Sequence, residues 1–68
     1  MESPIFKVEL NLGNAAFGST RQSQALEVAR ILKRVADNLI EEATDYPYLW
    51  DHNGNHVGSA MFKSRRLR

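Results

Sequence analysis

The first apolar segment of the chain alternates between hydrophobic and polar positions. Over residues 5–12, one face is entirely hydrophobic and consists of Phe6, Val8, Leu10 and Leu12. The positions between them on the other face are Lys7, Glu9 and Asn11. A period of two is typical of a β-strand with one buried face. Because Gly13-Asn14 breaks this pattern, we expect a short loop there, with Phe17 covering one end of the core.

The middle of the chain changes to a helical period. Ser19, followed by Gln22 three residues later, has the pattern of a capping box, and neither Gly nor Pro occurs from there to Ala43. The hydrophobic stripe comprises Ala25, Val28, Ala29, Leu32, Val35, Ala36, Leu39 and Ala43, with Leu26, Ile31 and Ile40 on its margins. The polar positions opposite it are Glu27, Arg30, Arg34, Asp37, Asn38 and Glu41. This spacing predicts one long amphipathic helix that ends before Pro47.

The last third of the chain has the pattern of a β-hairpin, since Asn53-Gly54 separates two apolar runs that contain aromatic residues. A two-residue loop would pair Trp50 with Val57. A three-residue loop would pair Leu49 with Val57, with Asp51 accepting backbone N–H groups at the start of a type I turn and the glycine in the left-handed conformation. We favour the three-residue loop because it turns both aliphatic residues toward the helix.

This register predicts which hairpin side chains face the helix. The inward set is Leu49, Val57 and Met61, and the outward set is Tyr48, Trp50, His56, Gly58, Ala60 and Phe62. We therefore predict an α+β fold of order β-α-β-β over residues 1–62. In this fold, a three-stranded antiparallel sheet with the last strand in its centre packs on one long amphipathic helix. One helix covers one face of such a sheet, so the other face is left as an apolar binding surface.

Composition limits the class of protein further. The chain has 68 residues, no cysteine and a formal net charge of +1. The lack of cysteine excludes disulfide scaffolds and cysteine zinc sites. No apolar run approaches the roughly 20 residues of a membrane span, and no signal-peptide pattern opens the chain. We expect a cytoplasmic protein without membrane association, and a core so small that self-association would add substantially to its stability.

Charge is distributed unevenly along the chain. Residues 1–45 carry a net charge of −2, whereas residues 46–68 carry +3. The basic groups at the end of the chain are Lys63, Arg65, Arg66 and Arg68. We expect residues 63–68 to form a flexible basic tail, and such a tail can neutralise nucleic-acid phosphates.

Three groups of residues partly resemble known metal-binding or catalytic motifs, but none of them matches its motif fully. The segment from Asp51 to Asn55 begins like a calcium loop but has its glycine at the wrong position. His52 and His56 flank the expected turn and have no further zinc ligands nearby. Asp51, His56 and Ser59 are the residue types of a hydrolytic triad, but no oxyanion loop accompanies them. We therefore expect no metal, no cofactor and no enzymatic activity.

Three stretches of the chain resemble short uncharacterised reading frames of bacteriophages, prophages and plasmids. They are residues 11–17 (NLGNAAF), 27–37 (EVARILKRVAD) and 49–58 (LWDHNGNHVG). The resemblance implies an origin in a mobile element and a bacterial intracellular setting, and it transfers no activity and no catalytic residues.

Small phage proteins without catalytic machinery often act by binding, and by this analogy we expect a protein–protein interaction. The partner would be a host or defence protein, or a second copy of the chain, and the binding residues would be Tyr48, Trp50, His56 and Phe62. The alternative is a nucleic-acid-binding protein that uses the same face together with Lys63, Arg65, Arg66 and Arg68.

Overall fold

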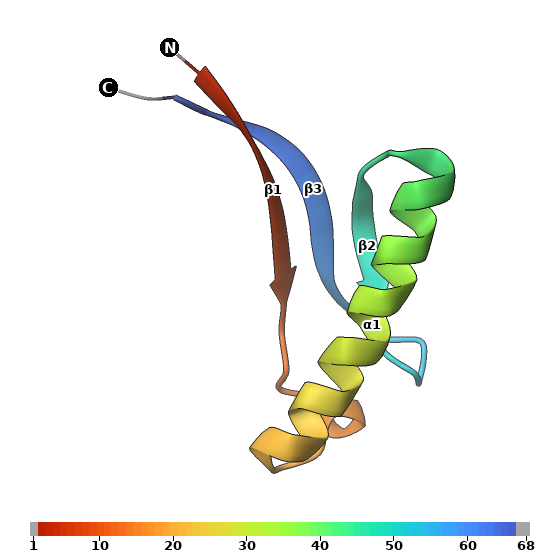
Figure 1. Ribbon diagram of the computed structural model, residues 1–68. Helices are drawn as coiled ribbons and strands as arrows, with labels where there is room; N and C mark the ends of the chain where they lie inside the picture. Colours follow the sequence, from red (N-terminus) through yellow and green to blue (C-terminus); the bar gives the residue numbers. More distant parts are fainter. Residues whose placement is uncertain (1, 67–68) are drawn as a thin grey trace.

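The computed structural model of the protein describes residues 2–66. The elements follow in the order β1 (Glu2–Leu10), the 3-10 turn η1 (Ala15–Phe17), α1 (Arg21–Glu42), β2 (Tyr46–Trp50) and β3 (His56–Arg66). The strands form one antiparallel sheet in the order β1-β3-β2, and α1 lies beside β2 (Figure 1). The predicted β-α-β-β order and the central position of the last strand are confirmed.

The helix begins one residue later than the sequence pattern suggested. Its N-cap is Thr20, whose hydroxyl accepts a hydrogen bond from the backbone N–H of Ser23 at 3.1 Å, while the Ser23 hydroxyl accepts one from the Thr20 N–H at 3.3 Å. The predicted cap at Ser19 is therefore wrong. Ser23 decides the register because its hydroxyl also donates to the Phe17 carbonyl at 2.9 Å, which ties the helix start to η1. Ala43 ends the helix in the left-handed conformation.

The core is small and lies where α1 meets η1, β2 and β3. Its buried residues are Phe17, Ile31, Val35, Leu49, Val57 and Ala60. Burial of Phe17 confirms its predicted place. The helix, however, turns Glu27, Ile31 and Val35 to the core, and Leu32 is 41% exposed. The predicted centre of the stripe is therefore wrong by about one position, because the carboxylate of Glu27 bonds the hairpin and draws its own side of the helix inward.

The hairpin loop has three residues, as favoured from the sequence. The Gly54 N–H donates to the Asp51 carbonyl at 3.0 Å, the Asp51 N–H donates to the Asn55 carbonyl at 3.0 Å, and Gly54 has φ of 82°. Trp50 then lies opposite His56, but the next paired residue on β2, Leu49, lies opposite Gly58. The predicted pairing of Leu49 with Val57 is therefore wrong.

Val57 is instead the extra residue of a β-bulge, and both Leu49 and Val57 are nonetheless buried. An added residue reverses the facing of every later position in the strand. Ala60 is fully buried in the core, so its predicted outward orientation is wrong.

Phe62 lies on the same face as Ala60, two residues further along β3. Its partner on β1 is Phe6, and their ring centroids are 4.9 Å apart. The prediction that Phe62 faces away from the helix is therefore wrong. Alternation likewise places Met61 on the face away from the helix, where inward burial was predicted.

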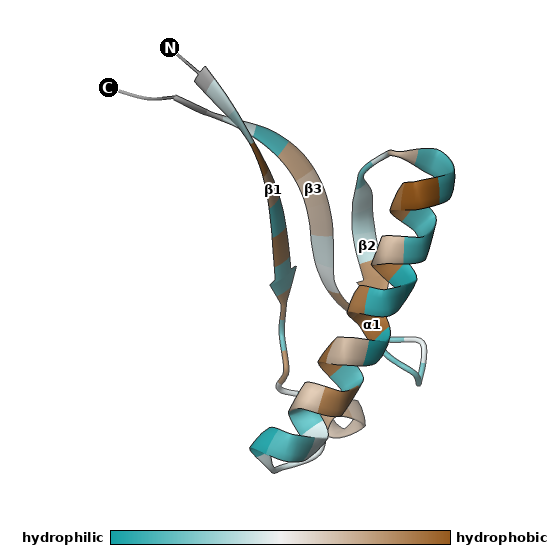
Figure 2. Cartoon of the chain, in the orientation of Figure 1, coloured by the Kyte–Doolittle hydropathy of each residue, from teal (hydrophilic) through white to brown (hydrophobic). Residues whose placement is uncertain are grey.

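Strand β3 extends past the predicted end of the domain at residue 62. Lys63 pairs with Ile5, and Arg66 pairs with Glu2. Residues 63–66 therefore belong to the sheet and not to a flexible tail, while Arg68 lies outside the described residues. The far ends of β1 and β3 extend beyond α1 as a two-stranded ribbon (Figure 1). Hydrophobic and hydrophilic positions alternate along this ribbon (Figure 2).

Candidate functional site

Three rings gather on the face of the sheet turned away from α1, which we call the outer face. The centroid of Tyr48 lies 6.3 Å from that of Trp50 and 5.1 Å from that of His56, and Trp50 lies 5.6 Å from His56. Tyr48 is 62% exposed and Trp50 is 52% exposed. We call these three residues the aromatic cluster. Aromatic rings at these separations stabilise one another by edge and stacking contacts. Much of the surface of Tyr48 and Trp50 nevertheless remains exposed to solvent.

The orientation of the aromatic cluster follows from the packing directly beneath it. Trp50 and His56 are a cross-strand pair next to the turn, and Tyr48 is two residues before Trp50 on β2. Leu49, between the two aromatic residues, is buried against α1. Successive residues of a strand point to opposite faces, so burial of Leu49 holds its two neighbours outward.

The turn that joins these strands is held by a buried carboxylate. Oδ1 of Asp51 accepts the backbone N–H groups of Asn53 at 2.8 Å and Asn55 at 2.9 Å. Its Oδ2 accepts the side-chain amides of Asn14 at 2.8 Å and Asn55 at 3.2 Å. Burial disfavours the charge of Asp51, but these donated hydrogen bonds outweigh burial and lower its pKa. The role predicted for Asp51 in the turn is confirmed.

A second buried carboxylate ties the turn to the helix. Glu27 accepts two hydrogen bonds from the Arg30 guanidinium, at 2.7 and 3.0 Å, and one from the backbone N–H of His52 at 2.8 Å. The hydrogen bond from Arg30 is the largest cause of the lowered pKa of Glu27, and Glu27 in turn raises the pKa of Arg30. Arg30 also donates to the Trp50 carbonyl at 3.4 Å. The end of β2 that carries Trp50 is thus fixed by hydrogen bonds with α1 on the inner side of the sheet.

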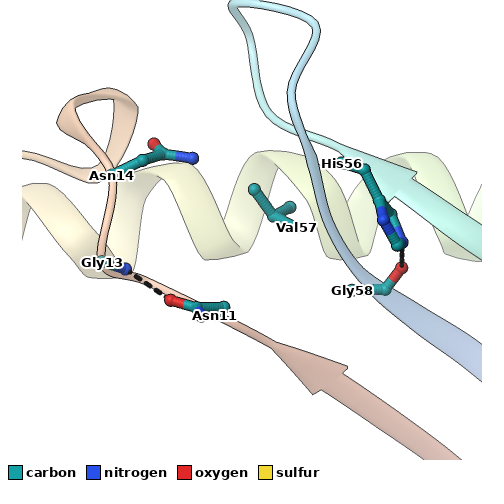
Figure 3. Close-up of a pocket in the computed structure, with 6 residues that line it drawn as sticks. All are labelled: Asn11, Gly13, Asn14, His56, Val57 and Gly58. Carbon is teal, nitrogen blue, oxygen red and sulfur yellow. Dashed lines mark hydrogen bonds between the residues drawn. The ribbon is translucent and has the colours of Figure 1, made fainter.

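A hollow with both polar and apolar lining adjoins the aromatic cluster at His56 (Figure 3). It has a volume of about 540 Å³ and is lined by Asn11, Gly13, Asn14, His56, Val57 and Gly58. Much of its polar lining is bonded internally, since Asn11 Oδ1 accepts from the Gly13 N–H at 2.8 Å and His56 Nε2 lies 3.1 Å from the Gly58 carbonyl. The hollow therefore borders the aromatic cluster and presents few polar groups that are free to bind a ligand.

The structure separates the other predicted binding residues from the aromatic cluster. Phe62 lies on the opposite face of the sheet, against Phe6. Lys63 is seven positions beyond His56 on β3, which at about 3.3 Å per residue is roughly 23 Å. The backbones of Arg65 and Arg66 pair with the start of β1. Arg68 lies outside the described residues.

Two titratable groups of the hairpin, Asp51 and His52, are engaged in contacts within the fold. Both oxygens of Asp51 are engaged by the turn and by Asn14, and His52 Nε2 lies 3.2 Å from the Ala16 carbonyl. Among the side chains that the structure describes, no three of His, Cys, Asp or Glu lie close enough together to hold a metal ion. No helix among the described residues is both long and apolar enough to cross a membrane.

Two residues of this region were not identified from the sequence. The helical pattern predicts Glu27 on the polar side of the helix, and the break at Gly13-Asn14 predicts only a short loop at Asn14. The signal for Glu27 is its spacing, because it is four residues before Ile31 and eight before Val35, on the same helical stripe. Nothing in the local sequence indicates that Asn14 reaches Asp51, 37 residues away.

Comparison of the chain with protein-family models, with curated proteins and with solved structures found no match.

Proposed function

We propose that this chain is a small non-enzymatic protein that acts by binding another protein through the aromatic cluster. In the setting that the sequence resemblance implies, the partner is a host or defence protein whose activity the chain modulates. The observation that carries the proposal is the exposure of Trp50 and Tyr48 side by side above a turn fixed by two buried carboxylates.

Two physical arguments favour a protein partner. Trp and Tyr are the residue types that most often dominate the binding energy of protein interfaces. A surface that is already rigid also loses little conformational freedom on binding. Here Leu49, Asp51 and Glu27 fix the strand that carries the aromatic residues. The conformational entropy of this surface is therefore already lost on folding, and little more is lost on binding.

Nucleic acid is the second candidate, since bases stack on exposed aromatic rings. The distribution of charge around the aromatic cluster favours nucleic acid less than a protein partner. Lys7 on the outer face lies 3.8 Å from Glu9, which offsets its charge, and Lys63 is roughly 23 Å along β3 from His56. Phosphates held by Lys63 would therefore be distant from bases stacked on Trp50.

The test uses tagged wild-type chain and two variants to capture partners from a bacterial host. Trp50→Ala removes the centre of the aromatic cluster. Leu26→Ala is the matched control, because Leu26 is 68% exposed on the helix and lies outside the aromatic cluster. Circular dichroism checks that both variants fold. The expected result is a protein that wild type and Leu26→Ala retain and Trp50→Ala loses at least tenfold.

Equal retention by all three chains would contradict the proposal. Loss of the captured material after nuclease treatment, together with a steep decline in binding between low and moderate salt, would assign the surface to nucleic acid instead.

A further inference from the structure

The face of the sheet turned toward α1, the inner face, is only partly covered by the helix. Contacts of α1 concentrate on η1 and β2. The side chains of Phe6, Val8 and Phe62 lie on this face, further along β1 and β3, and are exposed. From residue 4 to residue 10 of β1, and from 58 to 64 of β3, every inner position is uncharged; these positions are Pro4, Phe6, Val8, Leu10, Gly58, Ala60, Phe62 and Ser64.

The helix has an uncovered apolar flank next to this part of the sheet. Its exposed members are Ala25, Ala29, Leu32 and Ala36, at spacings of four, seven and eleven residues, which places them on one side of the helix. The flank faces the β1 side, because Ala25 and Val28 line a hollow together with Leu12, which follows β1. The opposite flank carries Arg30 and faces the hairpin.

We call these two sets together the open inner surface. Its sheet part is Phe6, Val8 and Phe62, and its helix part is Ala25, Ala29, Leu32 and Ala36. Figure 2 shows hydrophobic positions on both the strand and the helix that border it. Small side chains on a helix let another backbone approach closely, and large apolar side chains on a sheet are what a helix usually covers.

The dimensions of the chain exceed those expected of a compact monomer. The radius of gyration is 13.6 Å, whereas a compact chain of this length has about 11 Å. The accessible surface is 5306 Å², whereas a folded monomer of 7.7 kDa exposes about 4,300 Å². The excess of about 1,000 Å² is close to the roughly 800 Å² that each partner buries in a stable protein interface.

We infer that a second copy of this chain covers the open inner surface, so that the helix part of each copy packs on the sheet part of the other. A two-fold axis requires a self-complementary patch, in which each copy supplies both halves of the contact. The helix part spans about 17 Å at 1.5 Å per residue, and the uncharged strip of β1 that contains the sheet part, from Pro4 to Leu10, spans about 20 Å.

This dimer leaves the aromatic cluster free, since that cluster lies on the outer face. The inference is therefore independent of the proposed partner. A failure of one leaves the other standing, because Trp50→Ala acts on partner binding and changes at the open inner surface act on dimer formation.

The test measures the mass of the untagged full chain in solution by sedimentation over a range of concentrations. Wild type is expected at twice 7.7 kDa. Val8→Glu and Leu32→Glu place a carboxylate in the sheet part and the helix part, and each is expected to yield monomers. Ile5→Glu and Leu26→Glu are the matched controls, because Ile5 is 37% exposed on the outer face, against 36% for Val8 on the inner face, and both controls are expected to remain dimers.

A second measurement needs no variant and so does not depend on a variant folding. A mixture of isotope-labelled and unlabelled wild-type chains is expected to show intermolecular NMR contacts between the Val8 and Leu32 methyl groups. A wild-type chain that is monomeric up to sub-millimolar concentration would overturn the inference. So would a dimer whose intermolecular contacts arise from Tyr48 and Trp50.

Discussion

The two ends of the sheet differ in how their apolar side chains are covered. At the turn end, Leu49 and Val57 are buried beneath α1, and two carboxylates bond the turn to the helix and to the loop before it. At the ribbon end, Phe6 and Phe62 pair with each other across the strands, and both side chains are exposed. Both ends have apolar residues on the inner face.

The difference shows that hydrophobic content alone does not decide burial. The helix is anchored at the turn end by the hydrogen bonds of Glu27 and by the side chain of Phe17, so it covers what lies beneath that anchor. We therefore expect substitutions at the turn end to lower the free energy of unfolding, and substitutions at the ribbon end to act on association.

The largest expected effect is at Gly58, where the turn end meets β1. A Cβ built there would lie 1.9 Å from the Glu9 carbonyl oxygen, so Gly58→Ala forces the two strands apart. We expect a loss of about 3–5 kcal/mol in the free energy of unfolding, measured by urea denaturation. Gly54→Ala is the control: its Cβ would meet nothing within 4 Å, and only the positive φ opposes it, at about 1–2 kcal/mol. Equal losses would contradict the close approach of β1 and β3.

Leu49 and Trp50 are neighbours in β2 that test which face is buried. We expect Leu49→Ala to cost about 2–4 kcal/mol, because it leaves a cavity under α1. Trp50→Ala should cost less than about 1.5 kcal/mol, because its side chain is half exposed. Thermal unfolding of the two variants decides the order, and a larger loss for Trp50→Ala would mean that the faces of the hairpin are reversed.

The buried carboxylates give the turn end a dependence on pH. Hydrogen bonding lowers the pKa of Glu27 and of Asp51 in the folded protein. Their stabilisation is therefore fully present above about pH 4.3, the ordinary pKa of Glu, and is lost as the pH falls through the lower folded values. Glu27→Gln should remove about 1–2 kcal/mol at neutral pH, a modest figure because Arg30 is partly exposed.

Urea midpoints measured between about pH 6 and pH 2 check the effect of the carboxylates. The expected result is a shallower acid decline in Glu27→Gln than in wild type. An identical decline would show that Glu27 does not contribute.

The smallest expected effect is a gain in stability at the start of β2. The Tyr46 hydroxyl is buried with no hydrogen-bond partner among residues 2–66, and burial, followed by the charges of Glu42 and Glu41, raises its pKa. Tyr46→Phe removes the unsatisfied group and keeps the ring. We expect a gain of about 0.5–1 kcal/mol in calorimetry, and a loss would reveal a partner for the hydroxyl.

Local patterns in the sequence determined the elements and their order. Four features depend only on residues close together in the chain. They are the alternation in β1, the helical period of α1, the Asn53-Gly54 turn and the role of Asp51 in that turn. The exposure of Trp50 followed from the same local reasoning.

Only the tertiary structure decided the rest, because it depends on contacts between distant residues. The bulge at Val57 reverses the facing of Ala60 and Phe62, and it arises where β3 must pair with two strands at once. Burial of Glu27 requires a backbone N–H from 25 residues away. Lys63 belongs to a strand because Ile5, at the other end of the chain, supplies its partner. Periodicity reports which side of an element is apolar, and packing alone decides how far that side is covered.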